Sequence, residues 1–405
     1  MLRELLGHRC WIRRLALGSA ILVCLLSSGC SNNHQDWMDA ANSRWAVLRS
    51  SILLPAAENA FETGSLEQAN QTLAEALSVD PKNAKLHVLS GRIALERGEL
   101  ERAHQWFENA RTFDTENAAG HYYQGIVLQR WQRHGLARDC YQQALDLVSD
   151  NVYYLLAVAE MHVALNDVDQ AVELLESKLV IFDQNAGIRL ALGQLYAMKQ
   201  QYEHAADCYH DAALLQPDDL QILEDLAQIR LTGGQYEEAA RDLERLINEP
   251  THADRLNLRR QLATCYLKLG QNAQARQTLI EVTRKDRKDA DSWVRLSEMA
   301  WAEQDVSSTL VAANRAIALA PRQHKGYLLA GMVWHKRQHF DQAVRMFDQA
   351  AELAPDNSLP LVLRGMALEE DGKVDEAVRS YQQALNRQPN DQRALRLLAQ
   401  LSQGS

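Results

Sequence analysis

Few residues of this 405-residue chain combine the types and spacing that a chemical reaction requires. His335 and His339 stand four residues apart, which would place two imidazole ligands on one face of a helix. The pattern holds no carboxylate or third histidine beside them. Gly233 and Gly234 lack the downstream lysine of a phosphate-binding loop, and neither a nucleophile elbow nor a His-Glu-x-x-His sequence occurs. We therefore expect no catalytic residue, no metal site and no cofactor.

The residue with the clearest predicted chemistry is Cys30. Four arginines precede an apolar run at 15–26, and three small residues then lead to the cysteine. This order of segments is typical of a secretory signal. The apolar run has about a dozen residues, fewer than the ~20 that a membrane-spanning helix needs. Residues 1–29 are therefore predicted to be a signal peptide.

The end of this segment resembles a bacterial lipobox, although Ser27 stands where that motif usually has leucine. The resemblance implies cleavage after residue 29, attachment of lipid to Cys30, and a protein anchored in the bacterial envelope. Ser31 follows the cysteine, which by the same resemblance indicates the periplasmic face of the outer membrane. The alternative is an ordinary signal peptide in which Cys30 is coincidental.

The elements that would position functional residues follow a strict period of 34 residues. The central small residue of each repeat is Ala69, Ala103, Ala137, Ala171, Ala205, Ala239, then, after two inserted residues, Ala275, Thr309, Ala343 and Ala377. Other small residues recur 12 places before and seven places after these sites, with large apolar residues between them. Small side chains let two antiparallel helices approach closely, and bulky neighbours fill the remaining space.

The whole pattern resembles the tetratricopeptide repeat, a helix–turn–helix unit. One matching stretch contains Leu192, Gly193, Tyr196, Ala205, Tyr209, Ala212 and Pro217. We define ten units at 50–83, 84–117, 118–151, 152–185, 186–219, 220–255, 256–289, 290–323, 324–357 and 358–391. The resemblance implies an all-α fold, a right-handed α-solenoid of about ten repeats. Residues 392–405 are expected to form a capping helix and tail, in which Leu395, Leu398 and Leu401 cover the last repeat.

Several local departures qualify this pattern. Lys178, Leu246 and Val282 replace the third small residue of their repeats, and the stack is expected to bend or change pitch at 248–255. Residues 30–49 are predicted to hold the lipidated cysteine, a short polar tether and an N-terminal helix that Pro55 should kink or restart. Trp37 and Trp45 on that helix either pack on the first repeat or contact a membrane or partner. Cys140, Cys208 and Cys265 are expected to be unpaired, buried thiols.

In the resembled family, the first helix of each repeat lines the concave side of the solenoid. Its second, fifth, ninth, twelfth and thirteenth residues face inward. Carried onto this chain, the candidate partner-binding residues are Tyr122, Ile126, Arg130, Tyr153, Leu156, Glu160, Leu190, Gln194, Met198, Gln228, Arg260, Lys268, Met332 and His335. About half of such residues are expected to serve only packing between repeats. The apolar and aromatic strip of the central repeats suits an extended peptide or a helix.

The chain's charge limits the classes of partner. The net charge is −10, and removal of residues 1–29 would make it about −13. Such a surface repels nucleic acid and anionic headgroups, so membrane contact is expected only through the lipid. We expect a non-catalytic scaffold that gathers protein partners in an envelope, pilus, secretion or polysaccharide-export complex. The alternatives are a catalytic or cofactor-binding protein with a site hidden in the repeats, and a homo-oligomeric structural protein.

Overall fold

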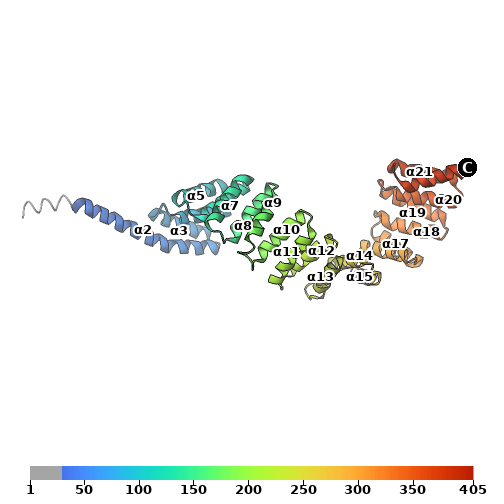
Figure 1. Ribbon diagram of the computed structural model, residues 1–405, viewed down its shortest axis with the longest axis horizontal. Coiled ribbons are helices and arrows are strands. Elements are labelled where there is room, and N and C mark those ends of the chain that lie inside the picture. Colours follow the sequence, from blue (N-terminus) through green and yellow to red (C-terminus); the bar gives the residue numbers. More distant parts are fainter. Residues whose placement is uncertain (1–29, 405) are drawn as a thin grey trace, which may run out of the picture. The chain divides into compact units, whose positions relative to one another are not determined.

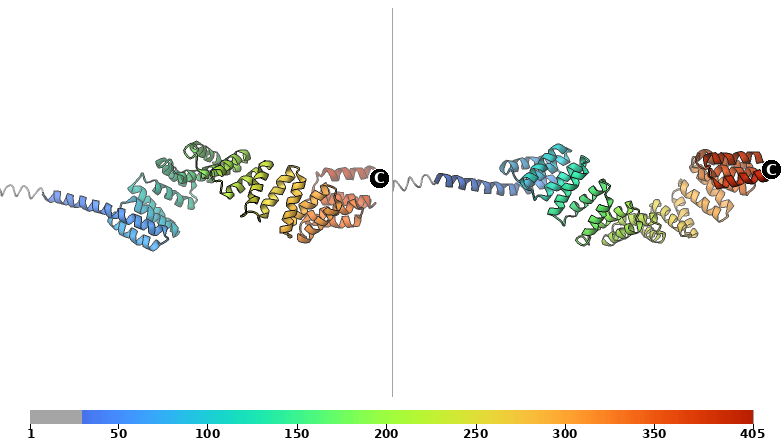
Figure 2. Two further views of the ribbon diagram at one scale, coloured as in Figure 1. Left: turned by 90° about the horizontal axis from the view of Figure 1, so that it is seen from below. Right: turned by 45° about the horizontal axis from the view of Figure 1, so that its top comes forward.

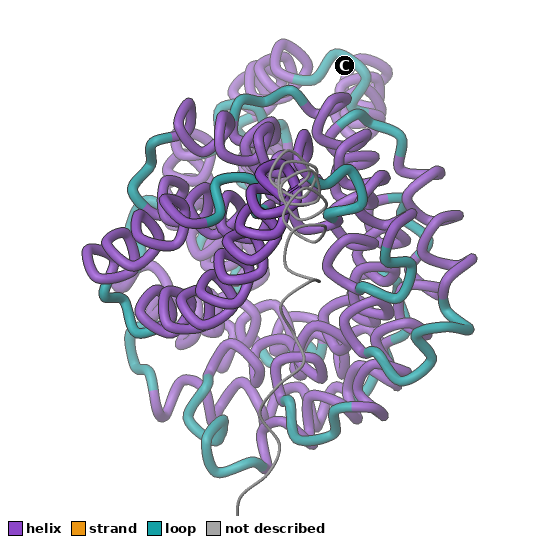
Figure 3. Tube along the Cα trace, turned by 90° about the vertical axis from the view of Figure 1, so that its left-hand side faces the viewer, coloured by secondary structure: helices purple, strands orange, loops and turns teal. Residues whose placement is uncertain are grey.

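The computed structural model describes residues 30–404, with side chains from residue 35 to residue 401. All regular structure in this range is helical (Figure 3). The signal peptide that the sequence predicts lies outside the described residues. The 21 helices of the described range are α2 (Cys30–Glu62), α3 (Leu66–Val79), α4 (Ala84–Glu96), α5 (Leu100–Phe113), α6 (Ala118–Arg130), α7 (His134–Leu147), α8 (Val152–Ala164), α9 (Val168–Lys178), α10 (Ala186–Met198), α11 (Tyr202–Leu215), α12 (Leu220–Thr232), α13 (Tyr236–Asn248), α14 (Leu256–Lys268), α15 (Asn272–Lys285), α16 (Ala290–Ala302), α17 (Val306–Leu319), α18 (His324–Lys336), α19 (Phe340–Leu353), α20 (Leu359–Glu370), α21 (Val374–Arg387) and α22 (Gln392–Gly404).

These helices form pairs that follow the ten predicted repeats (Figure 1). Each repeat supplies a first helix and a second helix, beginning with α2 and α3 and ending with α20 and α21. The chain divides into two compact units, which we call unit 1 (residues 1–183, with α2 to α9) and unit 2 (residues 184–405, with α10 to α22). The all-α solenoid of about ten repeats is thereby confirmed.

The repeated small residues lie where the two helices of a pair meet. All ten residues at the central place, nine alanines and Thr309, have an exposed fraction of 0%. The place 12 residues earlier, on the first helix, is also buried in every repeat. Small side chains at both places bring the two backbones together, as the period predicts.

The size of the first-helix residue is matched to the residue 16 positions later on the second helix. Glycine faces an aromatic ring in the pairs Gly91/Phe107, Gly125/Tyr141, Gly193/Tyr209, Gly331/Phe347 and Gly365/Tyr381. Alanine faces leucine in the pairs Ala57/Leu73, Ala159/Leu175, Ala227/Leu243 and Ala263/Leu279. A Cβ atom placed on Gly193 would lie 2.7 Å from the Tyr209 ring, closer than carbon atoms pack. The aromatic ring therefore requires the missing side chain.

Each first helix ends in the same backbone conformation. One residue per repeat has a positive φ, between 58° and 82°, and half of these residues are glycine. In the fifth repeat this residue is Gln200, and the Gln201 amide donates to the Tyr196 carbonyl at 2.9 Å. This six-to-one bond is the closing bond of a Schellman motif, which turns the chain into the second helix.

The first helices also begin in a common way. The last residue of a repeat is Asn83, Asn117, Asn151, Asn185, Asp219 or Asp289 in six repeats, and its side chain accepts a hydrogen bond from an amide of the next helix's first turn. These N-caps satisfy amides that the helix leaves unpaired.

Three repeats carry a larger residue in place of their third small residue, and these larger residues differ in burial. Leu246 and Val282 are fully buried, so these two repeats accommodate a larger residue in the core. Lys178 is half-buried, and α9 ends at this residue after only 11 residues. A lysine ammonium group is costly to bury without a partner, and the boundary between units 1 and 2 follows five residues later.

The N-terminal segment differs from expectation. Helix α2 is continuous from Cys30 to Glu62, so it includes both the segment expected as a tether and Pro55. Its C-terminal half packs on α3 and α4 through Ala57 and Ala60. Because this packing holds both sides of Pro55, the helix continues despite the missing amide donor. The N-terminal half extends beyond α3 (Figure 2).

The C-terminal helix covers the last repeat through two of the three leucines that we expected there, Leu398 and Leu401. Leu397, Leu398 and Leu401 pack against the cluster around Tyr381, and Ala394 is fully buried. Leu395, which we expected in this contact, is 42% exposed. At 100° per residue, Leu395 falls outside the arc that the other four residues share.

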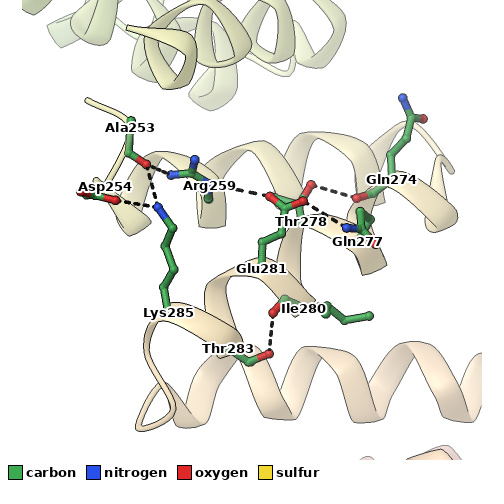
Figure 4. A network of polar contacts seen from close by, with 10 residues as sticks. All are labelled: Ala253, Asp254, Arg259, Gln274, Gln277, Thr278, Ile280, Glu281, Thr283 and Lys285. Carbon is green, nitrogen blue, oxygen red and sulfur yellow. Dashed lines mark hydrogen bonds and ion pairs between the residues drawn. The ribbon is translucent and has the colours of Figure 1, made fainter. Parts of the chain in front are cut away.

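The two inserted residues lengthen the loop between α13 and α14 to Glu249–Arg255. Lys285 of α15 donates to the Asp254 carboxylate at 2.6 Å and to the Ala253 carbonyl at 3.2 Å (Figure 4). Arg259 also donates to the Ala253 carbonyl. Arg255 makes two hydrogen bonds with Glu224. The insertion is thus held by the helices on both sides of it, while a bend at this point stays a prediction.

Candidate functional site

The first helices of unit 1 form an open hollow of about 640 Å³. It extends over the first helices of four successive repeats, from α2 to α8. Its lining comprises Glu58, Lys85, Val88, Leu89, Arg92, Asn117, Ala119, Tyr122, Tyr123, Asn151, Tyr153 and Tyr154. We call it the tyrosine hollow, because four tyrosines supply most of its aromatic surface.

Stacked and edge contacts fix these rings in place. The Tyr122 ring lies 5.4 Å from Tyr123 and 4.9 Å from Tyr154, measured between ring centroids. Tyr123 also stacks on Phe107 of the core at 5.6 Å. Aromatic pairs at such distances are mutually attractive, so the hollow is a firm surface and not a loose one. In contrast, Tyr153 at its edge is 70% exposed.

A cation lies within this aromatic surface. The Arg92 guanidinium carbon is 4.6 Å from the centroid of Phe61 and 5.4 Å from that of Tyr123. These distances are within the range of cation–π attraction. Burial raises the pKa of both Tyr122 and Tyr154 above the usual value for tyrosine. Tyrosine hydroxyl groups are protonated at neutral pH even at their ordinary pKa of about 10, so both can donate hydrogen bonds to a ligand.

Unit 2 has a second hollow, of about 670 Å³, on its own first helices. Its lining comprises Leu231, Asn257, Arg260, Gln261, Thr264, Leu267, Asp291, Val294, Arg295, Glu298, Gln323 and Lys325. We call it the charged hollow. Here Arg260 pairs with Asp289 at 3.1 Å, and Arg295 donates to the Thr264 hydroxyl at 2.6 Å. Lys325 also lies 3.6 Å from the Glu298 carboxylate, so the hollow offers a polar surface of mixed sign.

Both hollows are lined by the same positions of the repeat, chiefly its second, fifth, sixth and ninth residues. Three of the predicted partner-binding residues line them. Tyr122 and Tyr153 lie together in the tyrosine hollow, and Arg260 lies in the charged hollow.

The other predicted residues separate into two groups. Ile126, Leu190 and Met332 pack against buried clusters between helices, and Leu156 is half-buried. The remaining exposed candidates are Arg130, Glu160, Gln194, Met198, Gln228 and Lys268. Glu160 accepts a hydrogen bond from Gln129, which in turn accepts one from the Tyr141 hydroxyl.

The neighbour of His335 is Glu370, whereas a metal site would pair His335 with His339. Its Nε2 atom lies 3.1 Å from a carboxylate oxygen of Glu370, whereas His339 immediately precedes α19 and its ring contacts Trp334. Among the residues whose side chains are described, no group of three histidine, cysteine or acidic side chains could hold a metal ion. Within the same range, none of the helices has the length and apolarity to cross a membrane.

Some lining residues were missed by sequence reasoning. Tyr123 and Gln261 are the sixth residues of their repeats. None of the predicted partner-binding residues occupies this position. Asn117 and Asn151 are the N-caps described above, and they line the hollow between one first helix and the next. The signal that could have revealed them is the recurrence of asparagine at the last place of the first four repeats.

Cys140, Cys208 and Cys265 form no disulfide, as expected. Cys140 and Cys265 are buried, whereas Cys208 is half-buried. Burial raises the pKa of the Cys140 thiol and raises that of Cys265 to about 11. Both thiols are thus protonated and unreactive at neutral pH.

Comparisons with known proteins agree with this fold. Tetratricopeptide repeat models match residues 60–122, 190–253, 230–297 and 335–401. No curated protein sequence matches the chain.

Several solved structures are similar to parts of the chain. The pilF protein of Pseudomonas aeruginosa is 19% identical, with 50% of this chain and 92% of that chain covered and a TM-score of 0.44. For MamA the identity is 21%, the coverage is 40% of this chain and 94% of that chain, and the TM-score is 0.38. For the Cut9–Hcn1 hetero-tetramer of APC/C the identity is 13%, the coverage is 89% and 98%, and the TM-score is 0.40.

At these identities and TM-scores, the solved structures carry no information about the partners of this chain. The matched repeat models are more informative, since together they span more than half of the sequence and coincide with the helix pairs of the structure. This chain belongs to the tetratricopeptide repeat family.

Proposed function

We propose that this protein is a non-catalytic scaffold that binds partner polypeptides on its first helices. The tyrosine hollow is the observation that carries this proposal. It combines a firm aromatic floor, an exposed edge at Tyr153 and polar lining residues such as Asn117 and Asn151, over four repeats. Aromatic side chains supply much of the affinity in protein interfaces, and an extended peptide has the shape to follow successive repeats.

The proposed scaffold is anchored to the bacterial envelope by lipid on Cys30, on the periplasmic face of the outer membrane. The sequence before the cysteine supports this part, through the arginines, the apolar run and the small residues at 27–29. Assembly of an envelope, pilus, secretion or polysaccharide-export complex is the setting that such an anchor favours.

The partner-binding surface is tested by substitution and quantitative co-purification. Tyr153→Glu places a charge in the tyrosine hollow, whereas Leu136→Glu places one on α7, a second helix, at a residue that is 54% exposed. After crosslinking in cells, we expect the Tyr153→Glu chain to lose most partners and the Leu136→Glu chain to keep them. Equal partner sets for the two variants would contradict the assignment of the hollow.

The anchor is tested separately. Cells that express the full chain are labelled with radioactive palmitate, and the Cys30→Ala chain is the control. We expect label only in the chain with the cysteine. Label in both chains, or in neither, would contradict the anchor and leave the partner-binding surface unaffected.

A further inference from the structure

Helix α2 carries an exposed apolar stripe on its N-terminal half. Trp37, Ala41, Trp45, Leu48 and Ile52 follow one another at intervals of four, four, three and four residues. At 3.6 residues per turn they share one face of the helix, over about 22 Å of its length. Trp37 and Trp45 are 66% and 62% exposed, and Leu48 and Ile52 are also exposed. The first four of these residues line a shallow hollow of about 330 Å³.

This stripe is separate from the face that joins α2 to the repeats. Ser50, Leu53, Ala57 and Ala60 are the residues that contact α3 and α4 or are buried beside them. At 100° per residue, these residues lie roughly opposite the stripe. From Gln35 to Arg49, every residue of α2 is exposed or half-buried. The stripe is therefore accessible while the helix is packed on the first repeat.

Charges are distributed unevenly around the stripe. Arg44 and Arg49 flank it on its two sides, whereas Asp36 and Asp39 lie on the far side of the helix. Arg44 lines the hollow together with the two tryptophans, and Arg49 is 2.6 Å from the Glu75 carboxylate. Since Arg49 already pairs with Glu75, the cation considered beside the stripe is Arg44. An apolar stripe with a cation at its border and acids opposite suits a surface that is apolar inside and anionic at its rim.

The same charges argue against a second copy of this chain. If two copies paired through the stripe in parallel, Arg44 of one chain would approach Arg49 of the other. In antiparallel pairing, the two Arg44 side chains would meet near the centre of the contact. Like charges at the flanks of a helix pair are repulsive, so neither arrangement explains the stripe.

The position of the stripe in the chain indicates its occupant. Helix α2 begins at Cys30, four positions after the last residue of the apolar run at 15–26. Lipid on Cys30 would place the membrane attachment about 10 Å from Trp37 along the helix. Tryptophan is the residue that most favours the boundary between lipid and water.

We propose that the N-terminal half of α2 lies in the surface of an anionic phospholipid bilayer, with the Trp37–Ile52 stripe facing the acyl chains. This inference rests on the proposed membrane attachment and goes beyond it, because it assigns a second contact with the bilayer. It differs from the expectation that only lipid touches the membrane. A helix fixed in this way would set the orientation of the first repeat relative to the membrane, which a flexible tether would leave free.

The test uses the full chain, reconstituted in vesicles of phosphatidylethanolamine and phosphatidylglycerol. The photoreactive residue benzoylphenylalanine is placed at Trp45 or Leu48 in the stripe, or at Ser43 on the far side. Ser43 is exposed, and it is the matched control on the same helix. After irradiation, we expect about fivefold more phospholipid adduct from the two stripe positions than from Ser43.

Two results would overturn the proposal. One is an equal or undetectable yield of phospholipid adduct at all three positions. The other is a polypeptide adduct from Trp45 or Leu48 in place of lipid, either with a second copy in vesicles or with another protein in cell membranes. Failure of the anchor alone is read from the palmitate label, and circular dichroism of each labelled chain verifies that the helices are intact.

Discussion

At the scale of single residues, backbone geometry determines where the repeat accepts variation. The left-handed turn residue is glycine in five repeats, glutamine in four and asparagine in one. A residue with a side chain costs roughly 1–2 kcal/mol in this conformation. The recurrence of glycine is visible in the sequence, but the positive φ at glutamine is not, because the neighbouring hydrogen bonds impose it.

This cost leads to a prediction for Gln200, whose φ is 59°. We expect Gln200→Gly to raise the free energy of unfolding by about 0.5–1 kcal/mol, because the relief of strain exceeds the added flexibility of the unfolded chain. Denaturant unfolding followed by circular dichroism measures the change. The matched control is Gln383→Gly, an exposed position inside α21, where a loss of about 0.5–1 kcal/mol is expected. A loss at Gln200 as well would show that no strain is stored there.

At the scale of elements, the helix pair is specified by matched sizes across its contact. The positions of the small residues and the bounds of the ten repeats were predictable, because the 34-residue period can be read from the sequence without knowing which residues are in contact. The matching of glycine with aromatic rings was not predicted, since it requires knowing which residues face each other. The phase of α22 was likewise wrong at Leu395, because a single terminal helix has no repeated pattern that fixes its angle.

The pair Gly193 and Tyr209 allows a direct test of this matching. We expect Gly193→Ala to lower the free energy of unfolding by about 1–3 kcal/mol, because the new methyl group overlaps the Tyr209 ring. Adding Tyr209→Leu recreates the alanine–leucine pair of other repeats. The double mutant should therefore show a favourable coupling of about 1 kcal/mol in a mutant cycle. Strict additivity would mean that the two sizes are not matched.

The inserted loop at Glu249–Arg255 gives a prediction about pH. The hydrogen bond from Lys285 and its charge hold the pKa of Asp254 below the usual range of aspartate. A lowered pKa in the folded state means that this contact stabilises the loop at neutral pH and is lost as the pH falls through that lowered pKa.

The loop is followed by hydrogen exchange of its amides, corrected for the intrinsic rate at each pH. We expect Lys285→Met to speed exchange of 249–255 at neutral pH and to remove its dependence on acid. Lys288→Met is the control, because Lys288 is exposed and its side chain makes no contact with the loop. Identical exchange in both variants would contradict the assigned role of Lys285.

At the scale of the whole molecule, the two compact units offer surfaces of different chemistry. The tyrosine hollow belongs to unit 1 and the charged hollow to unit 2, although both use the same places of the repeat. Sequence reasoning found Tyr122, Tyr153 and Arg260, because the family pattern assigns their places. Ile126, Leu190 and Met332 instead pack against buried clusters between helices, and their part in partner binding stays a prediction.

The central claim is that partner polypeptides bind where the first helices of unit 1 form the tyrosine hollow. The most direct measurement places benzoylphenylalanine at Tyr153 in one chain and at Leu136 in another, irradiates cells, and identifies the adducts by mass spectrometry. The account predicts adducts with a defined set of polypeptides at Tyr153 that do not form at Leu136. The same polypeptides at both positions, or none at Tyr153, would contradict it.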